Sequence, residues 1–272
     1  MTLSEEQLRE FEERGYTVLR QLGTPEITES LATRVEEYLH GERPLEERMA
    51  FKFQRGKKPK RRGGNLEFIR KIKHLEYEER FWSFISDPRV VGPLTQVLGP
   101  DVLIWRADVF YKRPKTGWGI SPHQDAVYWP ISPIDDTYGT TSSLFYFMDD
   151  SDETNGGLGF LPGRHKEGPI PSARYDGDNA GERRISDECY SDDEKVYPTV
   201  SAGDAVLFHG MLPHLSERNT SQKPRRALAI TCWSARLKYS GFRKEIHGHE
   251  DPDYDWQPLK QLAGRTHEGC VF

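Results

Sequence analysis

Cysteine is scarce in this chain and long apolar runs are missing, and each absence removes a class of protein. The three cysteines, Cys189, Cys232 and Cys270, are odd in number and far apart, which argues against a disulfide framework or a zinc knuckle. No run of about eighteen apolar residues occurs, so we expect no membrane span. The acidic N-terminus has no apolar segment typical of a secretory signal, so the expected location is cytoplasmic.

A large excess of charge of one sign is also absent. A net charge of −5 over 272 residues, with 35% apolar and 30% charged residues, suits a globular enzyme and predicts no general attraction to nucleic acid. The charge is nevertheless patterned, basic from Lys52 to Arg62 and acidic from Asp176 to Glu194. Both segments can be solvated loops, or lids of which the basic one helps to hold an anionic substrate. A nucleic-acid patch would need more interleaved aromatic residues than Phe51 and Phe53.

Helical signals dominate about the first hundred residues. A capping box over Ser4–Gln7 predicts one helix, whose apolar side continues past a turn with Tyr16 and Val18. Residues 27–39 form a second amphipathic pattern. Asp87-Pro88 begins a third helix, which Pro93 is expected to kink or split.

Strand signals follow from residue 102 onward. The segment Val102–Lys112 is rich in β-branched and aromatic residues, as strands are. Further strands are expected at 122–128, 142–148, 157–161, 196–200, 205–208, 213–216 and 226–233. Short strands with loops of uneven length favour a double-sheet jelly roll, a mainly β fold buttressed by the N-terminal helices. With no linker or repeat, we expect one domain over 1–272, with a helical part about 1–100, a jelly-roll core about 101–235 and a C-terminal extension 236–272.

One His-x-Asp pair stands out as a metal-binding motif. Non-haem Fe(II) oxygenases use two imidazoles and one carboxylate, and leave the other positions of the octahedron open. A strand bearing His-x-Asp can supply two of these, since residues i and i+2 point to the same side. Of the pairs that start at His40, His74, His123, His165 and His249, only His123 lies in a strand-like segment followed by apolar and aromatic residues. The sequence therefore favours His123 and Asp125.

A third ligand is expected from a later strand, where His209 and His214 compete. Ser216 lies two residues after His214, and Arg225 follows beyond a turn. An arginine there can hold a carboxylate through a charge-assisted fork, with the hydroxyl completing the contact, which favours His214. Adjacent Arg226 competes for this role, and a surface salt bridge is the alternative for Arg225.

At this point the sequence resembles the phytanoyl-CoA dioxygenase family of Fe(II)/2-oxoglutarate oxygenases. The likeness runs from Glu6 to Trp233 and rests on four blocks, namely His123-Gln124-Asp125, the segments 155–165 and 203–209, and His214 to Ala227. The resemblance implies a double-stranded β-helix core with iron on His123, Asp125 and His214. It also implies 2-oxoglutarate on Arg225, assisted by Ser216, and structural roles for His165 and His209. Phe145 stands where the family often has tryptophan.

The resemblance further implies an oxidoreductase that hydroxylates, or otherwise oxidises, an unactivated C–H bond of a small molecule. Iron, 2-oxoglutarate and O2 would be the cofactors and co-substrates, with succinate and CO2 released. The carboxylate at Asp125 points to hydroxylation or a related oxidation and not to halogenation, since related halogenases carry a small residue there. The residues expected to face the substrate are Gln124, Tyr128, Trp129, Arg106 and Tyr111. If the basic residues contact the substrate, an anionic group on it is expected. Several of these aromatic residues fit a core equally well.

Two other function classes stay open from the residues alone. A non-catalytic jelly-roll binding protein would keep the fold without turnover. A cupin-type isomerase or metal hydrolase would use the same three ligands with another metal and would not need Arg225. The sequence gives no indication of the oligomeric state.

Overall fold

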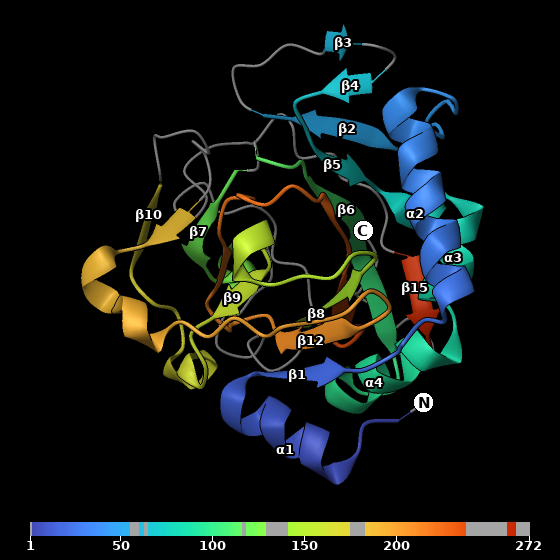
Figure 1. Ribbon diagram of the computed structural model, residues 1–272. Helices are drawn as coiled ribbons and strands as arrows, with labels where there is room; N and C mark the ends of the chain where they lie inside the picture. Colours follow the sequence, from blue (N-terminus) through green and yellow to red (C-terminus); the bar gives the residue numbers. More distant parts are fainter. Residues whose placement is uncertain are drawn as a thin grey trace.

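Antiparallel sheets form the centre of the computed structural model, which describes residues 2–54, 60–62, 65–115, 118–128, 141–174, 183–237 and 260–264 (Figure 1). The largest sheet has the order β1–β12–β8–β14–β6–β5–β2, with β15 pairing β6. Its strands are β1 (Tyr16–Leu19), β12 (Ala205–His209), β8 (Thr141–Phe147), β14 (Arg225–Ser234), β6 (Val102–Lys112), β5 (Ile69–Lys73), β2 (Ala50–Phe53) and β15 (Lys260–Ala263).

A smaller sheet lies against the inner face of the large one. It consists of β7 (Ile120–His123), β13 (His214–Ser216) and β9 (Leu158–Phe160), in the order β7–β13–β9. Phe160 packs in one buried cluster with Phe145 of β8, Phe208 of β12 and Ala227 of β14, so the two sheets share a core. Two short hairpins complete the strands of the described residues, β3 (Lys60–Arg62) with β4 (Asn65–Glu67) and β10 (Ser172–Arg174) with β11 (Arg183–Ile185).

Helices cover the outer face of the large sheet (Figure 1). They are α1 (Glu5–Arg14), α2 (Pro25–His40), α3 (Glu79–Ile85) and α4 (Pro88–Leu98). Successive residues of a strand point to opposite faces, so Leu144 and Tyr146 of β8 join the helices in a second core while Phe145 faces the smaller sheet. This two-sheet arrangement with flanking helices is the jelly roll that the sequence predicted.

The helix signals were read correctly except at Pro93. Ser4 and Gln7 form the expected capping box of α1, and Thr24 caps α2. Asp87 caps α4, which continues through Pro93 to Leu98 instead of splitting. A proline removes one backbone donor, but most helix stability in proteins comes from packing an apolar side. Buried Leu94 and Leu98 supply that packing here.

The first hundred residues contain strands as well as helices, which corrects the expectation of a helical part. Tyr16 and Val18 belong to β1 and pair with Phe208 and Val206, because Gly15 ends α1 in the left-handed conformation at φ 85°. The strands β2 and β5 join the same sheet, and α3 was not anticipated. The segment of β5 holds two isoleucines three residues apart among basic residues, so it lacks the alternation that indicates a strand.

Two expected strands differ in the structure. The segment 122–128 divides, since β7 ends at His123 and a 3-10 helix, η2 (Asp125–Tyr128), follows. The segment 196–200 forms only isolated bridges, Phe160 with Val196 and Ser151 with Val200. Pro198 lies between these bridges and has no N–H to donate to a ladder.

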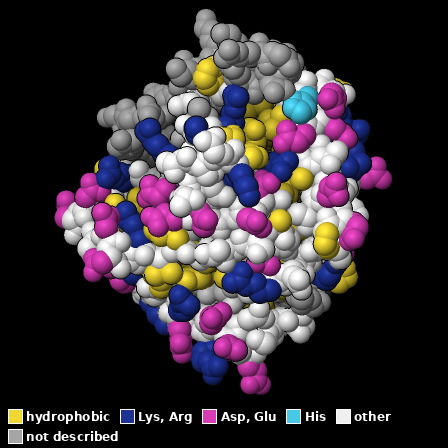
Figure 2. All heavy atoms as spheres, in the orientation of Figure 1, with side chains coloured by type: hydrophobic (Ala, Val, Ile, Leu, Met, Phe, Trp, Pro, Cys, Tyr) yellow, Lys and Arg dark blue, Asp and Glu magenta, His cyan; other side chains and the backbone are white. Residues whose placement is uncertain are grey.

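The outer surface carries mixed charge. Among the described residues on the face in Figure 2, acidic and basic side chains are interspersed, so these residues form no broad basic surface of the kind that binds phosphate backbones. Among the described residues, no helix has both the length and the apolar character needed to cross a bilayer.

The packing between the helices and the large sheet generates a stability prediction. Leu228 of β14 is fully buried in the helix-covered core, so Leu228→Ala is expected to lower the free energy of unfolding by roughly 2–5 kcal/mol. Half-buried Leu8 of α1 packs against the same core, and Leu8→Ala should cost less. Urea denaturation of both variants checks this, and an equal loss for both would contradict it.

Candidate metal centre

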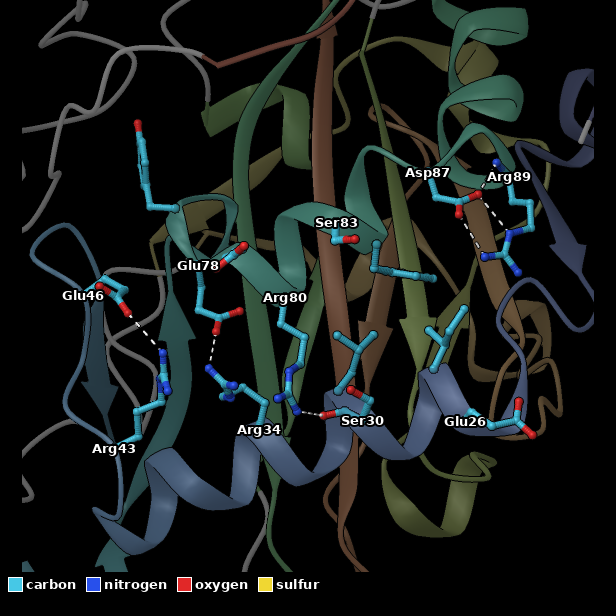
Figure 3. A pocket seen from close by; sticks show the side chains of 15 residues that line it. Glu26, Ser30, Arg34, Arg43, Glu46, Glu78, Arg80, Ser83, Asp87 and Arg89 are labelled. Atoms are coloured by element: carbon cyan, nitrogen blue, oxygen red, sulfur yellow. Dashed lines mark hydrogen bonds and ion pairs between the residues drawn. The ribbon is translucent and has the colours of Figure 1, made fainter.

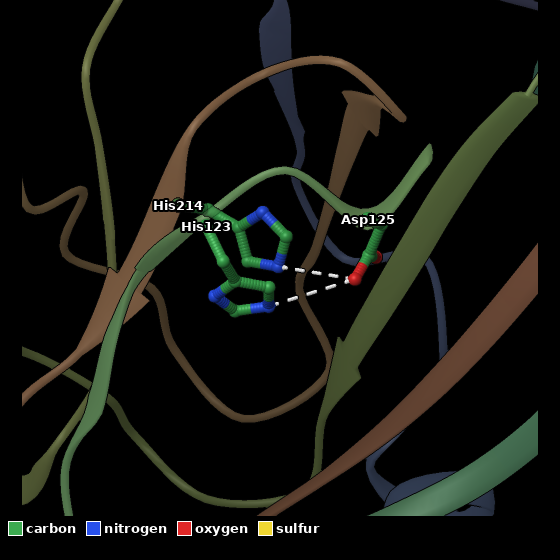
Figure 4. A group of neighbouring side chains, drawn as sticks. All are labelled: His123, Asp125 and His214. Atoms are coloured by element: carbon green, nitrogen blue, oxygen red, sulfur yellow. Dashed lines mark ion pairs between the residues drawn. The ribbon is translucent and has the colours of Figure 1, made fainter. Parts of the chain in front are cut away.

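His123 and Asp125 meet His214, which comes from a distant part of the sequence, between the two sheets (Figure 4). His123 is the last residue of β7, and His214 is the first residue of β13 and its register partner. Asp125 begins η2 and turns its carboxylate toward both rings. Its Oδ1 lies 3.6 Å from His123 Nε2 and 3.8 Å from His214 Nε2. The three ligand atoms lie within 4.8 Å of one another, so this group could hold a metal ion.

The group fits the donor set of a non-haem iron site. When metal–ligand bonds are about 2.1 Å long, neighbouring ligand atoms of an octahedral site are about 3 Å apart. Each Nε2 atom would therefore have to move toward Asp125 Oδ1 by less than about 1 Å on metal binding. Two imidazoles and one carboxylate would leave the remaining positions to small ligands. The set is therefore open, as a catalytic metal site requires.

Hydrogen bonds at the far side of each ring fix which nitrogen faces the metal position. Nδ1 of His123 donates to the carbonyl of Ser121 at 2.9 Å, and Nδ1 of His214 donates to that of Leu212 at 3.1 Å. A protonated Nδ1 leaves the lone pair of Nε2 available for a metal. Both Nε2 atoms are those that face Asp125.

The protonation states also suit metal binding. Burial, reinforced by neighbouring His123, lowers the pKa of His214 to about 4, so this imidazole is neutral at neutral pH. Burial alone would raise the pKa of Asp125, but the facing His214 and His123 outweigh it and hold that pKa well below its usual range. A neutral imidazole and an ionised carboxylate are the forms that bind a cation.

Asp125 reaches this position for a different reason from the one expected. The His-x-Asp argument assumed a strand through both residues, whereas Asp125 lies in a turn. Ser143 donates to Asp125 Oδ2 at 3.3 Å. The amide of Gln124 donates to the carbonyls of Gly168 and Met211 and accepts from Ile170 N, which anchors the turn. The motif therefore converges through a clamped turn and not through strand alternation.

The competing histidine lies elsewhere. His209 packs against His165 at a ring separation of 5.2 Å and against Phe11 at 6.2 Å, and its Nδ1 accepts from Met211 N. His165 Nε2 contacts the carbonyl of Glu12. Both rings therefore pin α1 and the following turn to the barrel, away from Asp125.

Arg225 occupies a buried position at the start of β14. Its side chain is 1% exposed, and its Nη2 donates to the carbonyl of Gly156 at 2.9 Å. Its Nε and Nη1 have no hydrogen-bond partner among the described residues. Burial lowers the pKa of Arg225 to about 10, so the group stays cationic at neutral pH. Buried donors normally have partners, so this guanidinium offers two open donors to an anion.

Its neighbour Arg226 faces the other way. Arg226 pairs with Asp149 at 2.6 Å and with Glu36 of α2 at 2.8 Å, on the helix-covered face. Successive strand residues point to opposite faces, so only Arg225 faces the inner side. The geometry therefore favours Arg225 over Arg226 for a partner on the inner side.

A lysine that the sequence analysis missed completes this end of the site. Ser216 is 2% exposed and its Oγ accepts from Lys112 Nζ at 2.9 Å. Lys112 is the last residue of β6 and the register partner of Arg225. The available signal was a basic residue at the end of an otherwise apolar strand.

Charged residues on β5 and β6 lie on the metal side of the large sheet. Arg106 Nε pairs with Asp108 Oδ2 at 2.9 Å, and Lys71 Nζ lies 4.0 Å from the same oxygen. Burial lowers the pKa of Lys71 to about 7, and the charge of Lys71 acts on both Asp125 and His214. Arg106 therefore lies on the metal side of the large sheet, and the sequence analysis did not single out Lys71 or Asp108, which lie beside it.

The other expected substrate contacts have mixed positions. The amide of Gln124 is engaged by backbone groups, as described above. Tyr111 packs with the helix-covered core on the face of Arg226, so the structure does not bring it to the metal group. Tyr128 ends η2, but its side chain lies outside the described residues, as does all of Trp129. Parts of the two charged segments, residues 55–59 and 175–182, also fall outside the described residues.

Two tryptophans line the inner face beyond the metal group. Trp105 and Trp233 stack at 4.4 Å, and Trp233 packs in one cluster with Ala126 and Met211. The ladder between β14 and β6 shifts its register between Thr231 and Cys232, opposite Trp105. Such a bulge re-aims a side chain, which explains why a strand pattern alone did not single out Trp105.

A groove between α2 and α3 differs from this site in its chemistry (Figure 3). It has a volume of about 760 Å³. Its arginines already have partners, since Arg34 pairs with Glu78, Arg43 with Glu46 and Arg89 with Asp87. Each of these guanidinium groups thus has a carboxylate partner, whereas Arg225 forms no ion pair with a carboxylate among the described residues.

Comparison with known proteins decides the family. The family model of phytanoyl-CoA dioxygenase matches residues 11–227, which is most of the chain. The chain belongs to this family. Membership agrees with the family resemblance that the sequence showed.

Relatives within the phytanoyl-CoA dioxygenase family are distant. The Caenorhabditis elegans phytanoyl-CoA dioxygenase domain-containing protein 1 homolog is 28% identical over 156 residues, which cover 53% of this chain and 51% of that protein. The peroxisomal phytanoyl-CoA dioxygenase of Rattus norvegicus is 26% identical over 247 residues, covering 87% of this chain and 70% of that one. The chain thus spans about half of the Caenorhabditis elegans protein and 42% of its Caenorhabditis briggsae counterpart.

Solved structures confirm the fold. The non-haem monooxygenase ThoJ in its apo form superposes with a TM-score of 0.71 at 18% identity, covering 97% of this chain and 85% of that chain. EvdO2 from Micromonospora carbonacea var. aurantiaca, in complex with 2-oxoglutarate, gives 0.67 at 18% identity, with coverage of 94% and 98%. At such low identity these likenesses establish the jelly-roll architecture.

The geometry of the metal group predicts which histidine a metal needs. His214→Ala removes one of three converging donors and should weaken binding of Fe(II), or of Co(II) as a spectroscopic probe, by at least about tenfold. His209→Ala serves as the matched control, because His209 contacts His165 and not Asp125, and it should leave metal affinity unchanged. Metal titration of both variants decides the matter, and the reverse pattern would refute the assignment of the group.

Proposed function

We propose that this protein oxidises an unactivated C–H bond of a small molecule, with iron held by His123, Asp125 and His214. The distal carboxylate of 2-oxoglutarate is bound by Arg225, assisted by Ser216. One observation carries the proposal, namely that Arg225 is buried with two open donors on the sheet face that also bears the metal group. A buried guanidinium in this state calls for a carboxylate of complementary shape.

The spacing of the two binding elements supports 2-oxoglutarate. Ser216 lies two residues beyond His214 on one strand, which places the two Cα atoms about 6–7 Å apart on the same side. A five-carbon diacid has a similar reach, so one end can lie at the metal position while the other meets Ser216 and Arg225. The EvdO2 structure, complexed with 2-oxoglutarate, is consistent with this use of the shared fold.

When bound, iron and 2-oxoglutarate supply the oxidising power taken from O2, with succinate and CO2 as the other products. The protein contributes geometry and charge. His123 and His214 present their Nε2 atoms, and ionised Asp125 balances part of the metal charge. Apolar side chains of Phe145 and Ala229 lie between the two ends of the site and exclude water from it.

The charges on β5 and β6 favour a substrate with an anionic group. Arg106 and Lys71 both pair with the carboxylate of Asp108, which brings two basic side chains to the metal side of the large sheet. The stacked pair of Trp105 and Trp233 adds a flat apolar wall on the same face. We infer a small substrate that combines an apolar body with one acidic group, oxidised by hydroxylation or a related reaction.

Two other functions would use the same fold. A binding protein without turnover, or a metal isomerase or hydrolase, would not need a guanidinium kept open for a second carboxylate. The buried state of Arg225 therefore favours the oxygenase over both.

An assay of succinate formation tests the proposal. With Fe(II), ascorbate and 2-oxoglutarate, the wild-type protein should release succinate slowly, and His123→Ala or Asp125→Ala should abolish it. Arg225→Ala should raise the KM for 2-oxoglutarate by about 10- to 100-fold, because a charge-assisted fork contributes about 1.5–3 kcal/mol. Arg226→Ala is the control, since Arg226 binds Asp149 and Glu36. Turnover that does not depend on 2-oxoglutarate would rule the function out.

A further inference from the structure

Lys112 is a buried cation beside Ser216, where the proposed function places the distal carboxylate of 2-oxoglutarate. It is not one of the three metal ligands, and the proposed contact of Arg225 with that carboxylate does not involve it. It is fully buried at the end of β6. Its ammonium group donates to Ser216 Oγ at 2.9 Å and to the carbonyl of Glu217. The ring of Trp118 lies 5.4 Å from Nζ. Burying an ammonium group costs free energy, which favours a function for this charge within the site.

The hydrogen bond between Lys112 and Ser216 has a defined direction. An ammonium has three donors and no acceptor, whereas a hydroxyl both donates and accepts. Ser216 Oγ must therefore accept from Lys112, and its own O–H is left to point elsewhere. The lysine thus turns Ser216 into a donor directed away from Nζ, which is the form that a carboxylate requires.

Lys112 and Arg225 also face each other across the ladder between β6 and β14. Like charges on directly opposed strand residues repel, which is destabilising. An anion that lies between the two side chains would convert this repulsion into attraction. Both cations touch the same backbone, because Arg225 Nη2 donates to Gly156 O while a Cβ on Gly156 would lie 2.6 Å from Lys112 Cδ.

We propose that Lys112 is a positioning residue for 2-oxoglutarate, which orients the Ser216 hydroxyl as a donor and adds a second positive charge beside Arg225. The inference rests on the proposed function and deepens it. Its consequence is selectivity, since the pocket requires a 2-oxo acid with a second carboxylate. A 2-oxo acid of equal length without that carboxylate, such as 2-oxopentanoate, gains nothing from Lys112.

Binding measurements on the Zn(II)-loaded full chain test this without turnover. Calorimetric titration with 2-oxoglutarate and with 2-oxopentanoate is carried out on wild type, Lys112→Met, Ser216→Ala and the double variant. We expect Lys112→Met to weaken 2-oxoglutarate about tenfold, the size of one charge-assisted hydrogen bond, and to leave 2-oxopentanoate within about twofold. Because the lysine acts partly through Ser216, the double variant should bind 2-oxoglutarate more tightly than the product of the two single losses predicts.

Lys260→Met is the matched control. Lys260 also donates to a backbone carbonyl, that of Glu76, and packs on Trp82, but it pairs with the opposite end of β6. This variant should bind both acids as wild type does. If Lys112→Met does not fold, Lys112→Ala, which also removes both the N–H donors and the charge, is measured and read in the same way.

The outcomes separate the lysine from the function. If wild type binds 2-oxoglutarate and a folded Lys112 variant binds it equally well, the positioning role is wrong and the proposed function stands. An equal weakening of both acids would show a merely structural lysine and would also overturn the role. A wild-type protein that does not bind 2-oxoglutarate overturns both proposals.

Discussion

The pairing of β13 with β7 is the contact on which the site depends. It sets His214 opposite His123, so the two imidazoles meet across directly paired strands. On its other side β13 pairs with β9, which packs through Phe160 onto the large sheet. The short strand is therefore held from both edges, and a three-residue element can keep a metal-binding geometry that it could not keep alone.

The second constraint is the burial of charge. Arg225, Lys112 and Asp108 are almost inaccessible to water, and an isolated buried charge is strongly unfavourable. Asp108 is compensated within the protein by Arg106 and Lys71. For Arg225 the compensation is incomplete among the described residues, since only Nη2 has a partner. That imbalance is tolerable if the pocket is occupied by an anion during the working cycle.

Sequence reasoning reached the fold and the metal group because both rest on local patterns. Strand segments such as Val102–Lys112 carry their own alternation and composition, and His123, Asp125 and His214 could be chosen from their neighbourhoods. It failed where the outcome depends on partners distant in the chain. The turn at Asp125 is held by Ser143 and by the clamp around Gln124, and neither contact leaves a periodic signal.

The same limit explains the residues that were missed. Nothing in the sequence distinguishes Lys71 and Lys112 from solvated lysines, because only the sheet shows which face they occupy. Tyr111 and Phe110 are neighbours of similar character, and only register assigns one to the helices and the other to the inner face. Burial of a charged side chain is a property of the assembled sheet, so composition could not reveal it.

The alternation of Arg225 and Arg226 carries a consequence for the alignment of β14. The first guanidinium serves the interior, while the second ties the strand to Glu36 of α2 and to Asp149. A register shift of one residue would turn Arg225 toward the helices and Arg226 toward the interior, so each guanidinium would lose the partners it needs. The adjacent arginines thus favour one register of β14, because a shifted register would be destabilised at both positions. Correct folding and a correctly charged interior are secured by the same pair of residues.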